Sequence, residues 1–306
     1  MHPQRVESLS HAQRERLVYI DFRLYFMGEV GRPDLASRFG VAPAAATRDL
    51  ALYREVAPQN IEFDGSNKIY RIGKAFAPLF DHAPQRVLSA LSLGFGDGVN
   101  GVPQPILPCE SPTVLSGPHM DVLAPICRAI HQECPLTLDY YSISSGRTER
   151  EIVPFALIDN GLRWHVRAFD RKSKEFRDFV ITRIRHPVVL KGQPVALHET
   201  SDQDIQWTRI VELELIPHPD QPRPEITEMD YGMRDGVLRM KLRAATAGYI
   251  LRQWSVDCSP DHSLRGHEYR LWLKDHLALY GVKNAILAPG YRPPDQHVSK
   301  RRSTDD

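Results

Sequence analysis

One stretch in the middle of the chain constrains the fold more than any other. Residues 154–170 hold two β-like runs that flank an Asn-Gly pair, and such a pair between two strands is typical of a tight hairpin turn. Side chains alternate along a strand, so His165, Arg167 and Phe169 share one face of the second run. A strand with a histidine and an arginine on one face suits a core poorly, and it is well suited to line a site that binds an anion.

Basic residues gather around this hairpin. Residues 163–185 hold eight Lys or Arg against three Asp or Glu, whereas the whole chain has a formal net charge of only +1. A second strand over these residues would bring Arg177 and Arg183 to the face of His165 and Arg167. Arginine is favoured where phosphate is bound by a planar, bidentate contact. From the charges alone two interpretations stay open: an anion site, or a solvated edge strand with ordinary ion pairs.

The N-terminal segment has the order of a winged helix-turn-helix. A helix over residues 10–27 carries an apolar face and is followed by glycines, and a short helix then runs from about Arg32 to Gly40. Pro43 begins another helix, which extends to about Glu55. Two helices joined by a short turn that contains glycine are the helix-turn-helix pattern. Residues 60–64 and 68–72 alternate around a Gly-Ser-Asn turn and predict a hairpin wing.

The second helix and the wing are the expected DNA-binding surface. Small residues allow close approach to base edges, while Thr47 and Arg48 reach a phosphate or a guanine edge. The predicted DNA-binding residues are Arg32, Ala44, Ala45, Thr47, Arg48, Lys68 and Arg71. The alternative is a structural helical lid, such as an oligomerisation domain. Residues 1–74 hold eleven Lys or Arg against nine Asp or Glu, so the order of the elements, rather than the charge, favours DNA binding.

The passage over residues 154–170 and the strand expected over residues 176–184 resemble WYL domains, which are ligand-sensing modules usually attached to bacterial DNA-binding domains. The name-giving Trp-Tyr-Leu triplet reads Trp164-His165-Val166 here. The whole order resembles WYL-type regulators of the BrxR and CapW kind, found beside bacterial anti-phage operons. The resemblance implies an α+β, multidomain fold with a winged helix-turn-helix, a small Sm- or SH3-like β-barrel and an α+β C-terminal dimerisation domain. It implies a ligand-responsive homodimeric repressor of an inverted-repeat operator on double-stranded DNA.

The resemblance also implies a pocket that combines tyrosine, serine, histidine and arginine. Matched by position, the ligand-binding residues are Tyr141, Ser142, Ser144, His165, Arg167, Arg177 and Arg183. Tyr141 and Ser142 are neighbours on one strand, so only one of them can face the pocket. The expected effector is anionic, a nucleotide or a short nucleic acid, because the empty cationic cluster would repel itself. Protonation of His165 below about pH 6.5 would strengthen its binding.

The expected boundaries divide the chain into five parts. They are residues 1–74 for DNA binding, 75–118 as a helical linker and connector, 119–200 as the ligand-sensing domain, 201–290 as the C-terminal extension and 291–306 as a disordered tail. In the ligand-sensing part we expect a helix over residues 120–132 and five strands, the last near 188–196. In the C-terminal part we expect strands over 209–216 and 236–244, with helices near 219–230 and 246–255.

Several function classes find no support in the sequence. The four cysteines have no zinc spacing and are expected to be free thiols in a reducing cytosol. The chain has neither a run of 18 apolar residues nor an apolar segment at its start, so we expect a cytoplasmic protein without a membrane span. No nucleophile-elbow pattern and no metal-ligand pair at helical spacing supports catalysis, so we expect neither an enzyme nor a metal or cofactor. The remaining alternative is a module that binds single-stranded nucleic acid on its basic strands, without promoter control.

Overall fold

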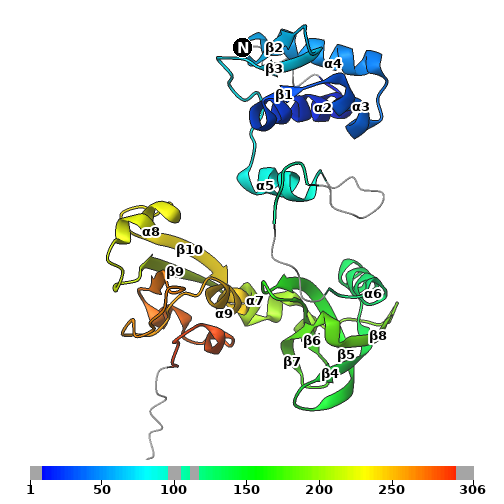
Figure 1. The fold of residues 1–306 in the computed structure, drawn as a ribbon. Helices are drawn as coiled ribbons and strands as arrows, with labels where there is room; N and C mark the ends of the chain where they lie inside the picture. Colours follow the sequence, from blue (N-terminus) through cyan, green and yellow to red (C-terminus); the bar gives the residue numbers. More distant parts are fainter. Residues whose placement is uncertain (1–8, 96–104, 111–116, 294–306) are drawn as a thin grey trace, which may run out of the picture. The chain divides into compact units, whose positions relative to one another are not determined.

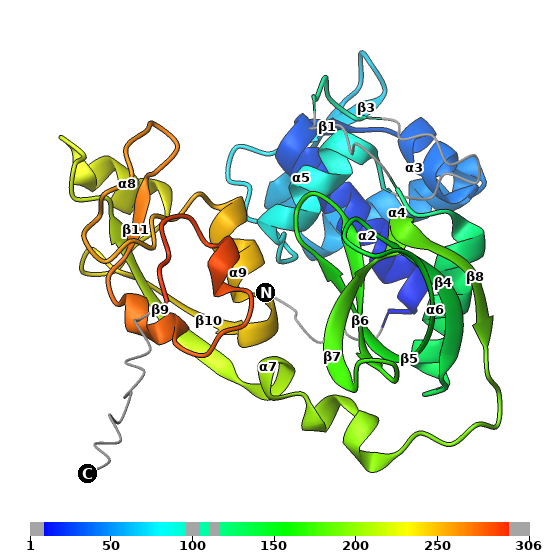
Figure 2. The ribbon, with the colours of Figure 1, turned by 90° about the horizontal axis from the view of Figure 1, so that it is seen from below.

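The structure is a computed structural model that describes residues 9–95, 105–110 and 117–293 (Figures 1 and 2). It divides into two compact units, Met1–Pro112 and Thr113–Asp306, which are described separately. Their mixture of helices and antiparallel sheets confirms the α+β, multidomain class. None of the helices in the described ranges is long and apolar enough to cross a membrane. The predicted disordered tail lies outside the described residues from position 294 onward.

The first unit contains the predicted helix-turn-helix and wing. Helix α2 (His11–Phe22) continues as a π-helical turn (Arg23–Met27) and stops at Gly28, whose φ of 77° favours glycine. Helices α3 (Arg32–Phe39) and α4 (Pro43–Val56) follow, and strands β2 (Ile61–Asp64) and β3 (Ile69–Ile72) form the hairpin. Strand β1 (Glu29–Val30) completes a sheet of order β1-β3-β2. The fully buried side chains of Leu17, Ile20, Leu24, Leu35, Leu50 and Tyr53 form the core.

A buried carboxylate fastens the segment after the wing to α2. Asp21 is completely buried and accepts hydrogen bonds from the Tyr53 hydroxyl and from the backbone N–H groups of Leu79 and Phe80, the latter two at 3.1 and 3.4 Å. The imidazole of His82 lies 2.8 Å from the same carboxylate. Helix α5 (Pro84–Leu93) comes directly after this segment and buries apolar side chains against α2. The chain that leaves the wing is therefore held against the winged helix-turn-helix.

The second unit begins with helix α6 (Met120–His131) and a curled five-stranded sheet, which together are called the barrel, residues 120–189. The strands are β4 (Leu136–Ser142), β5 (Gly146–Asp159), β6 (Trp164–Asp170), β7 (Glu175–Val180) and β8 (Ile184–Val189). Their order is β7-β6-β5-β4-β8, and a single 3-10 turn (Ile181–Arg183) joins the two edge strands β7 and β8. The sheet must curl to bring its edges that close, as Figures 1 and 2 show.

The strand over residues 161–169 and its Asn-Gly turn are confirmed in place by the β5–β6 hairpin. The expected strand near 188–196 is wrong, because β8 spans Ile184–Val189. The 3-10 turn has already carried the chain across the barrel, so the last strand begins earlier. Gly192, with a φ of 78°, turns the chain away soon after β8 ends.

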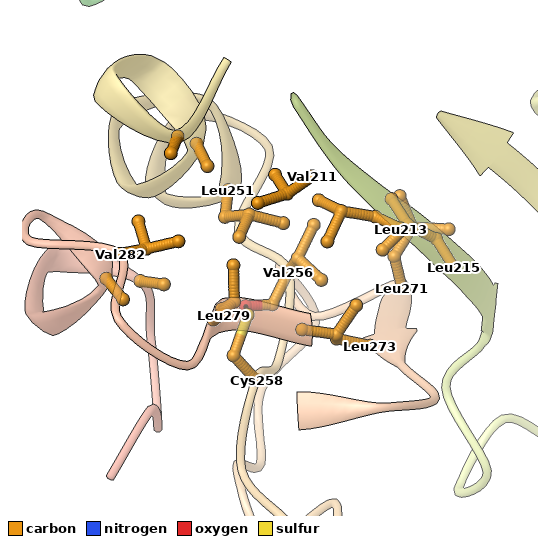
Figure 3. Close-up of a cluster of buried hydrophobic side chains, with 14 residues drawn as sticks. Val211, Leu213, Leu215, Leu251, Val256, Cys258, Leu271, Leu273, Leu279 and Val282 are labelled. Carbon is orange, nitrogen blue, oxygen red and sulfur yellow. Dashed lines mark hydrogen bonds between the residues drawn. The ribbon is translucent and has the colours of Figure 1, made fainter. Parts of the chain in front are cut away.

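The C-terminal part, residues 201–293, starts with helix α7 (Ile205–Thr208) and contains an antiparallel sheet of order β10-β9-β11. Its strands are β9 (Ile210–Pro217), β10 (Leu238–Arg243) and β11 (Leu271–Leu273), and its longer helices are α8 (Pro224–Asp230) and α9 (Ala244–Gln253). Figure 3 shows Val211, Leu213 and Leu215 of β9 packed with Leu251 of α9 and with β11. Helix α8 begins at Pro224 rather than near residue 219, because proline is accommodated in a first helical turn.

Candidate functional site

Helix α4 presents the expected recognition residues to solvent. Ala44, Thr47 and Arg48 are exposed and Ala45 is half-buried, whereas Leu50 on the opposite side is fully buried. The Thr47 hydroxyl donates a hydrogen bond to the Pro43 carbonyl at 2.9 Å, so its proton is used within the helix. The side chain of Arg48 makes no ion pair with any described residue. An exposed arginine beside small residues suits contact with a DNA groove.

A largely buried ion pair fixes the orientation of α4. The Arg16 guanidinium on α2 contacts both oxygens of Asp49, with Nε–Oδ2 at 2.6 Å and Nη2–Oδ1 at 3.3 Å. Both side chains are shielded from solvent, and a bidentate contact of this kind restricts rotation as well as separation. Because Asp49 is held inward against α2, its neighbour Arg48 is directed outward. The surface of α4 is thus presented in one orientation relative to the rest of the first unit.

A groove of about 420 Å³ separates α4 from the wing. Three of the predicted DNA-binding residues, Arg32, Thr47 and Lys68, line it together. Phe63 of β2 also lines it and is 54% exposed, and the sequence analysis missed this residue. Alternation places Phe63 on the same strand face as the buried Ile61, so the sequence pattern gave no signal of its exposure. The structure therefore brings cations from the helix-turn-helix and the wing to one concave surface.

Arg71 is placed differently from the other predicted DNA-binding residues. Its Nε donates to Asp64 at 3.0 Å, and its Nη1 lies 3.6 Å from Glu29, so it links the wing strand to β1. Hydrogen bonds from Asn67 and Arg71 lower the pKa of Asp64 to about 2. The carboxylate therefore stays charged and holds the wing turn through the backbone N–H groups of Ser66 and Asn67. In this arrangement Arg71 braces the wing.

His165 and Arg167 of β6 lie in a junction between the barrel and the C-terminal part. Both residues are buried, and 5% of the surface of each is exposed. The Arg167 guanidinium contacts Asp204 twice, at 2.6 and 3.1 Å, and Asp178 of β7 at 2.7 Å. The His165 ring stacks on Tyr249 of α9 with centroids 5.4 Å apart, and the Tyr249 hydroxyl donates to Asp178 at 2.9 Å. The expectation of a self-repelling cationic wall is wrong, because two carboxylates neutralise Arg167.

The predicted convergence of four basic side chains on one face is also wrong. Strands β6 and β7 pair with Arg167 opposite Asp178 and Ala168 opposite Arg177. Residues directly opposite each other share a face, so Arg177 lies on the other face of the sheet from Arg167. Arg183 belongs to the 3-10 turn and is half-buried, and its side chain has no hydrogen bond or ion pair within the described ranges. His165 and Arg167 thus share a sheet face on which Arg177 does not lie, and Arg177 approaches Arg167 only at the sheet edge, where both line one pocket.

The remaining predicted pocket residues lie on β4 and in the hairpin after it. Tyr141 is exposed, whereas its neighbour Tyr140 turns inward, where its hydroxyl accepts the backbone N–H of Val180 at 3.3 Å. Ser142 shares the face of Tyr140, and its hydroxyl lies 3.0 Å from that of Ser144. Tyr141 and Ser142 therefore face opposite sides. Since β5 lies between β4 and β6, the structure does not gather this set around Arg167.

Burial changes the expected titration of His165. Desolvation lowers the pKa of His165 below its ordinary value, and this effect outweighs the opposing attraction of Asp178, while Arg163 lowers the pKa further. The Nδ1 atom is buried and has no hydrogen-bond partner among the described residues. If Nδ1 carried a proton, the charged ring would be shielded from water and this N–H would have no acceptor among the described residues. The lowered pKa disfavours the charged ring in the folded protein, so the structure does not support the expected strengthening of ligand binding just below pH 6.5.

The shift has a measurable consequence for stability. Because the folded-state pKa is below the unfolded value of about 6.5, the unfolded chain binds a proton first as the pH falls. The stabilisation is present above pH 6.5 and is lost as the pH falls toward the folded pKa. We expect urea unfolding of the wild type to show a steeper loss of stability between about pH 7.5 and 5.5 than unfolding of His165→Phe. Equal slopes for the two proteins would contradict this role of His165.

Comparison with known proteins gives matches over most of the chain. Residues 12–92 match the family described as BrxR transcriptional regulator winged helix-turn-helix domain, residues 121–189 match the WYL domain, and residues 210–279 match the BrxR transcriptional regulator C-terminal dimerization domain. The DNA-binding transcriptional repressor CapW of Escherichia coli is 30% identical over 284 residues, which cover 88% of this chain and 91% of that protein. CapW of Pseudomonas aeruginosa is 30% identical over 259 residues, or 80% of this chain and 83% of that protein.

Among solved structures, proteasome accessory factor B/C of Arthrobacter aurescens aligns with 18% identity and a TM-score of 0.26. The alignment covers 79% of this chain and 44% of that one, and the likeness is too weak to bear on the fold.

Proposed function

We propose that this chain, which belongs to the family of BrxR and CapW transcriptional regulators, is a DNA-binding transcriptional repressor. The observation that carries the proposal is Arg48, which is exposed and forms no ion pair with the residues that the structure describes, on a helix fixed by the Arg16–Asp49 ion pair. The groove that holds Arg32, Thr47 and Lys68 adjoins this helix and supplies cations for backbone phosphates. In this arrangement α4 contacts the bases, which gives sequence specificity, and the groove contacts the phosphates, which positions the protein on the duplex, as is usual for DNA-binding proteins.

The proposal extends to a homodimer on an inverted repeat. One recognition helix contacts only a few base pairs, so selective binding needs two half-sites about one helical turn apart. A two-fold protein dimer matches an operator of that symmetry. The match of residues 210–279 to a dimerization domain supports the C-terminal part as the source of the contact. In this division residues 1–74 bind DNA, 75–118 connect, 119–200 sense a ligand, and 201–290 hold the dimer together.

We also propose that the repressor is cytoplasmic, that an anionic ligand regulates its binding to DNA, and that it controls an anti-phage defence operon. The match of residues 121–189 to the WYL domain and the resemblance to defence-associated regulators support this. A ligand regulates only if it binds the DNA-free and DNA-bound conformations with different affinity. The junction around Arg167 joins the sensing part to the dimerising part, and a change there would alter the spacing of the two recognition helices.

The DNA-binding proposal predicts a specific effect of one substitution. Arg48→Ala should weaken binding to a duplex from the promoter of the chain's own gene by about 1–3 kcal/mol if Arg48 contacts a base, or lower the salt dependence if it contacts phosphate. Arg54→Ala is the matched control, because Arg54 is exposed on the same helix but points about 120° away from Arg48. Fluorescence anisotropy measures both affinities, and the stoichiometry should be two chains per operator.

Two outcomes would contradict the proposal. If Arg48→Ala and Arg54→Ala bind the duplex with the same affinity as the wild type, α4 is not the recognition helix. If a single strand of the same sequence competes as well as the duplex, the alternative of a single-stranded nucleic-acid module gains support over promoter control.

A further inference from the structure

We propose that a phosphomonoester of mononucleotide size binds in a pocket between the edge of the barrel sheet and the C-terminal part. This inference rests on the proposed ligand-sensing function and locates its site at the edge of the sheet, where Arg167 of β6 and Arg177 of β7 both line the pocket. The pocket has a volume of about 370 Å³, and its charged walls come from both sides of the junction, with Arg167 and Arg177 on the barrel and Lys283 on the C-terminal part. That volume is at the lower end of ligand sites, which suits a single nucleotide.

The two side-chain amides of the pocket are already used. Gln206 donates from Nε2 to the Gly281 carbonyl at 3.0 Å and accepts the Lys283 backbone N–H at 2.9 Å. Asn284 donates to the Ala245 carbonyl at 2.6 Å and accepts the Gly248 N–H at 3.1 Å. These bonds hold the loop that carries Lys283 against α7 and α9. Since the amides build the wall, recognition of a ligand falls to the charged side chains. Three of these are cationic, Arg167, Arg177 and Lys283, and two are carboxylates, Glu175 and Asp178.

Two of the cations can reach a ligand at little cost. Lys283 is exposed and forms no ion pair with the described residues. The pKa of Glu175 is lowered by the hydrogen bond from Arg177 and, after it, by the positive charge of Lys283. Arg177 pairs with Glu175 at 2.9 Å, and the side chains of both residues are about half exposed. Exposed pairs of this kind are weak, so a dianionic phosphate can replace the single carboxylate between Arg177 and Lys283. The carboxylate of Glu175 thus occupies the place that the phosphate would take.

Arg167 supplies the inner wall of the pocket. Its contacts to Asp204 and Asp178 use three of its five N–H donors, which leaves two for a ligand. A phosphate held by Arg177, Arg167 and Lys283 would connect β7 directly to the 281–284 loop. Binding would then stiffen the junction between the sensing and dimerising parts, which is the kind of differential contact that regulation requires. Tyr249 and Phe176 supply the apolar surface for the organic group.

The test is calorimetric titration of the full-length protein with 5′-AMP, with adenosine as the ligand control. AMP should bind the wild type and adenosine should not. Lys283→Gln and Arg177→Gln should each weaken AMP binding about tenfold or more, as expected for the loss of a charge-assisted hydrogen bond. Lys241→Gln is the matched control, because Lys241 is an exposed lysine of the C-terminal sheet, paired with Glu212 at 2.6 Å and outside the pocket. Its AMP affinity should equal that of the wild type.

The inference is overturned if AMP does not bind the wild type, or if Lys283→Gln and Lys241→Gln bind it equally. Operator affinity of the same preparations, measured without AMP, separates this result from the proposed function. Lys283→Gln should bind operator as the wild type does. If the wild type binds no operator, the repressor proposal fails, while the titration still decides whether the pocket takes a phosphate.

Discussion

Replacing Arg167 with methionine is expected to lower the free energy of unfolding by about 3–5 kcal/mol, the usual cost of removing one partner from a buried ion pair. The substitution leaves the buried carboxylate of Asp204 and the partly buried carboxylate of Asp178 without their shared cation. Desolvation disfavours the charge of Arg167, yet its pKa is raised overall, because hydrogen bonds and attraction from these two carboxylates outweigh that effect. Urea unfolding of the full-length protein measures the change. Arg177→Met is the control, and it should change the stability little because its ion pair is exposed.

A second variant makes this prediction stricter. Adding Asp204→Asn to Arg167→Met removes one of the uncompensated charges and should recover part of the lost stability. The Asn side chain can still cap α7, where the Asp204 carboxylate accepts the Gln206 N–H at 3.0 Å. If Arg167→Met is as stable as Arg177→Met, the junction does not depend on this ion pair. If Asp204→Asn instead worsens the single variant, the cost does not come from an unpaired charge.

The local sequence signals predicted the winged helix and the hairpin well, because they act over a few residues. Glycines near the ends of the first helices, Pro43 at the start of α4 and the Asn-Gly turn each require one backbone conformation at one place. Alternation along β6 also assigned faces correctly, since Val166 and Ala168 are fully buried in the barrel core while His165 and Arg167 face the other way.

The relation between β6 and β7 was not predictable from alternation. Asp170 pairs with Glu175 across a four-residue turn, so odd-numbered residues of β6 lie opposite even-numbered residues of β7. A turn of one residue more or fewer would have placed Arg177 with Arg167, because a shift of one position moves every side chain to the other face. The composition of residues 171–174 does not fix the length of the turn. The register that results from this length places Arg177 on the other face of the sheet from Arg167.

The partners of Arg167 were hidden for a different reason. Asp204 is 37 residues away along the chain and Tyr249, which binds Asp178, is 71 residues from it. When the carboxylates that neutralise a basic strand come from a distant part of the chain, the sequence of the strand alone resembles that of an open anion site. The tertiary fold supplies the carboxylates, and the candidate site moves from the face of β6 to the pocket at its edge.

Contacts between residues far apart in the sequence also make Asp21 important for the stability of the first unit. Asp21→Ala is expected to lower the free energy of unfolding by about 3 kcal/mol or more, because each buried donor left without a partner costs about 1–3 kcal/mol. The Tyr53 hydroxyl and the Leu79 N–H lose their acceptor, and the buried His82 ring loses its contact. Burial and the hydrogen bond to Asp21 both raise the pKa of Tyr53, so this hydroxyl keeps its proton and remains a donor. Urea unfolding measures the loss, and the exposed Asp81→Ala should show little change.

Amide hydrogen exchange distinguishes this role of Asp21 from a general loss of packing. The N–H groups of Leu79 and Phe80 should exchange faster in Asp21→Ala, whereas the N–H of Ala57, which bonds to the Tyr53 carbonyl within the same unit, should change only as far as global stability changes. Equal acceleration at all three sites would mean that Asp21 stabilises the fold without holding the segment after the wing. Selective acceleration would identify Asp21 as the residue that fixes the direction in which the chain leaves the DNA-binding fold.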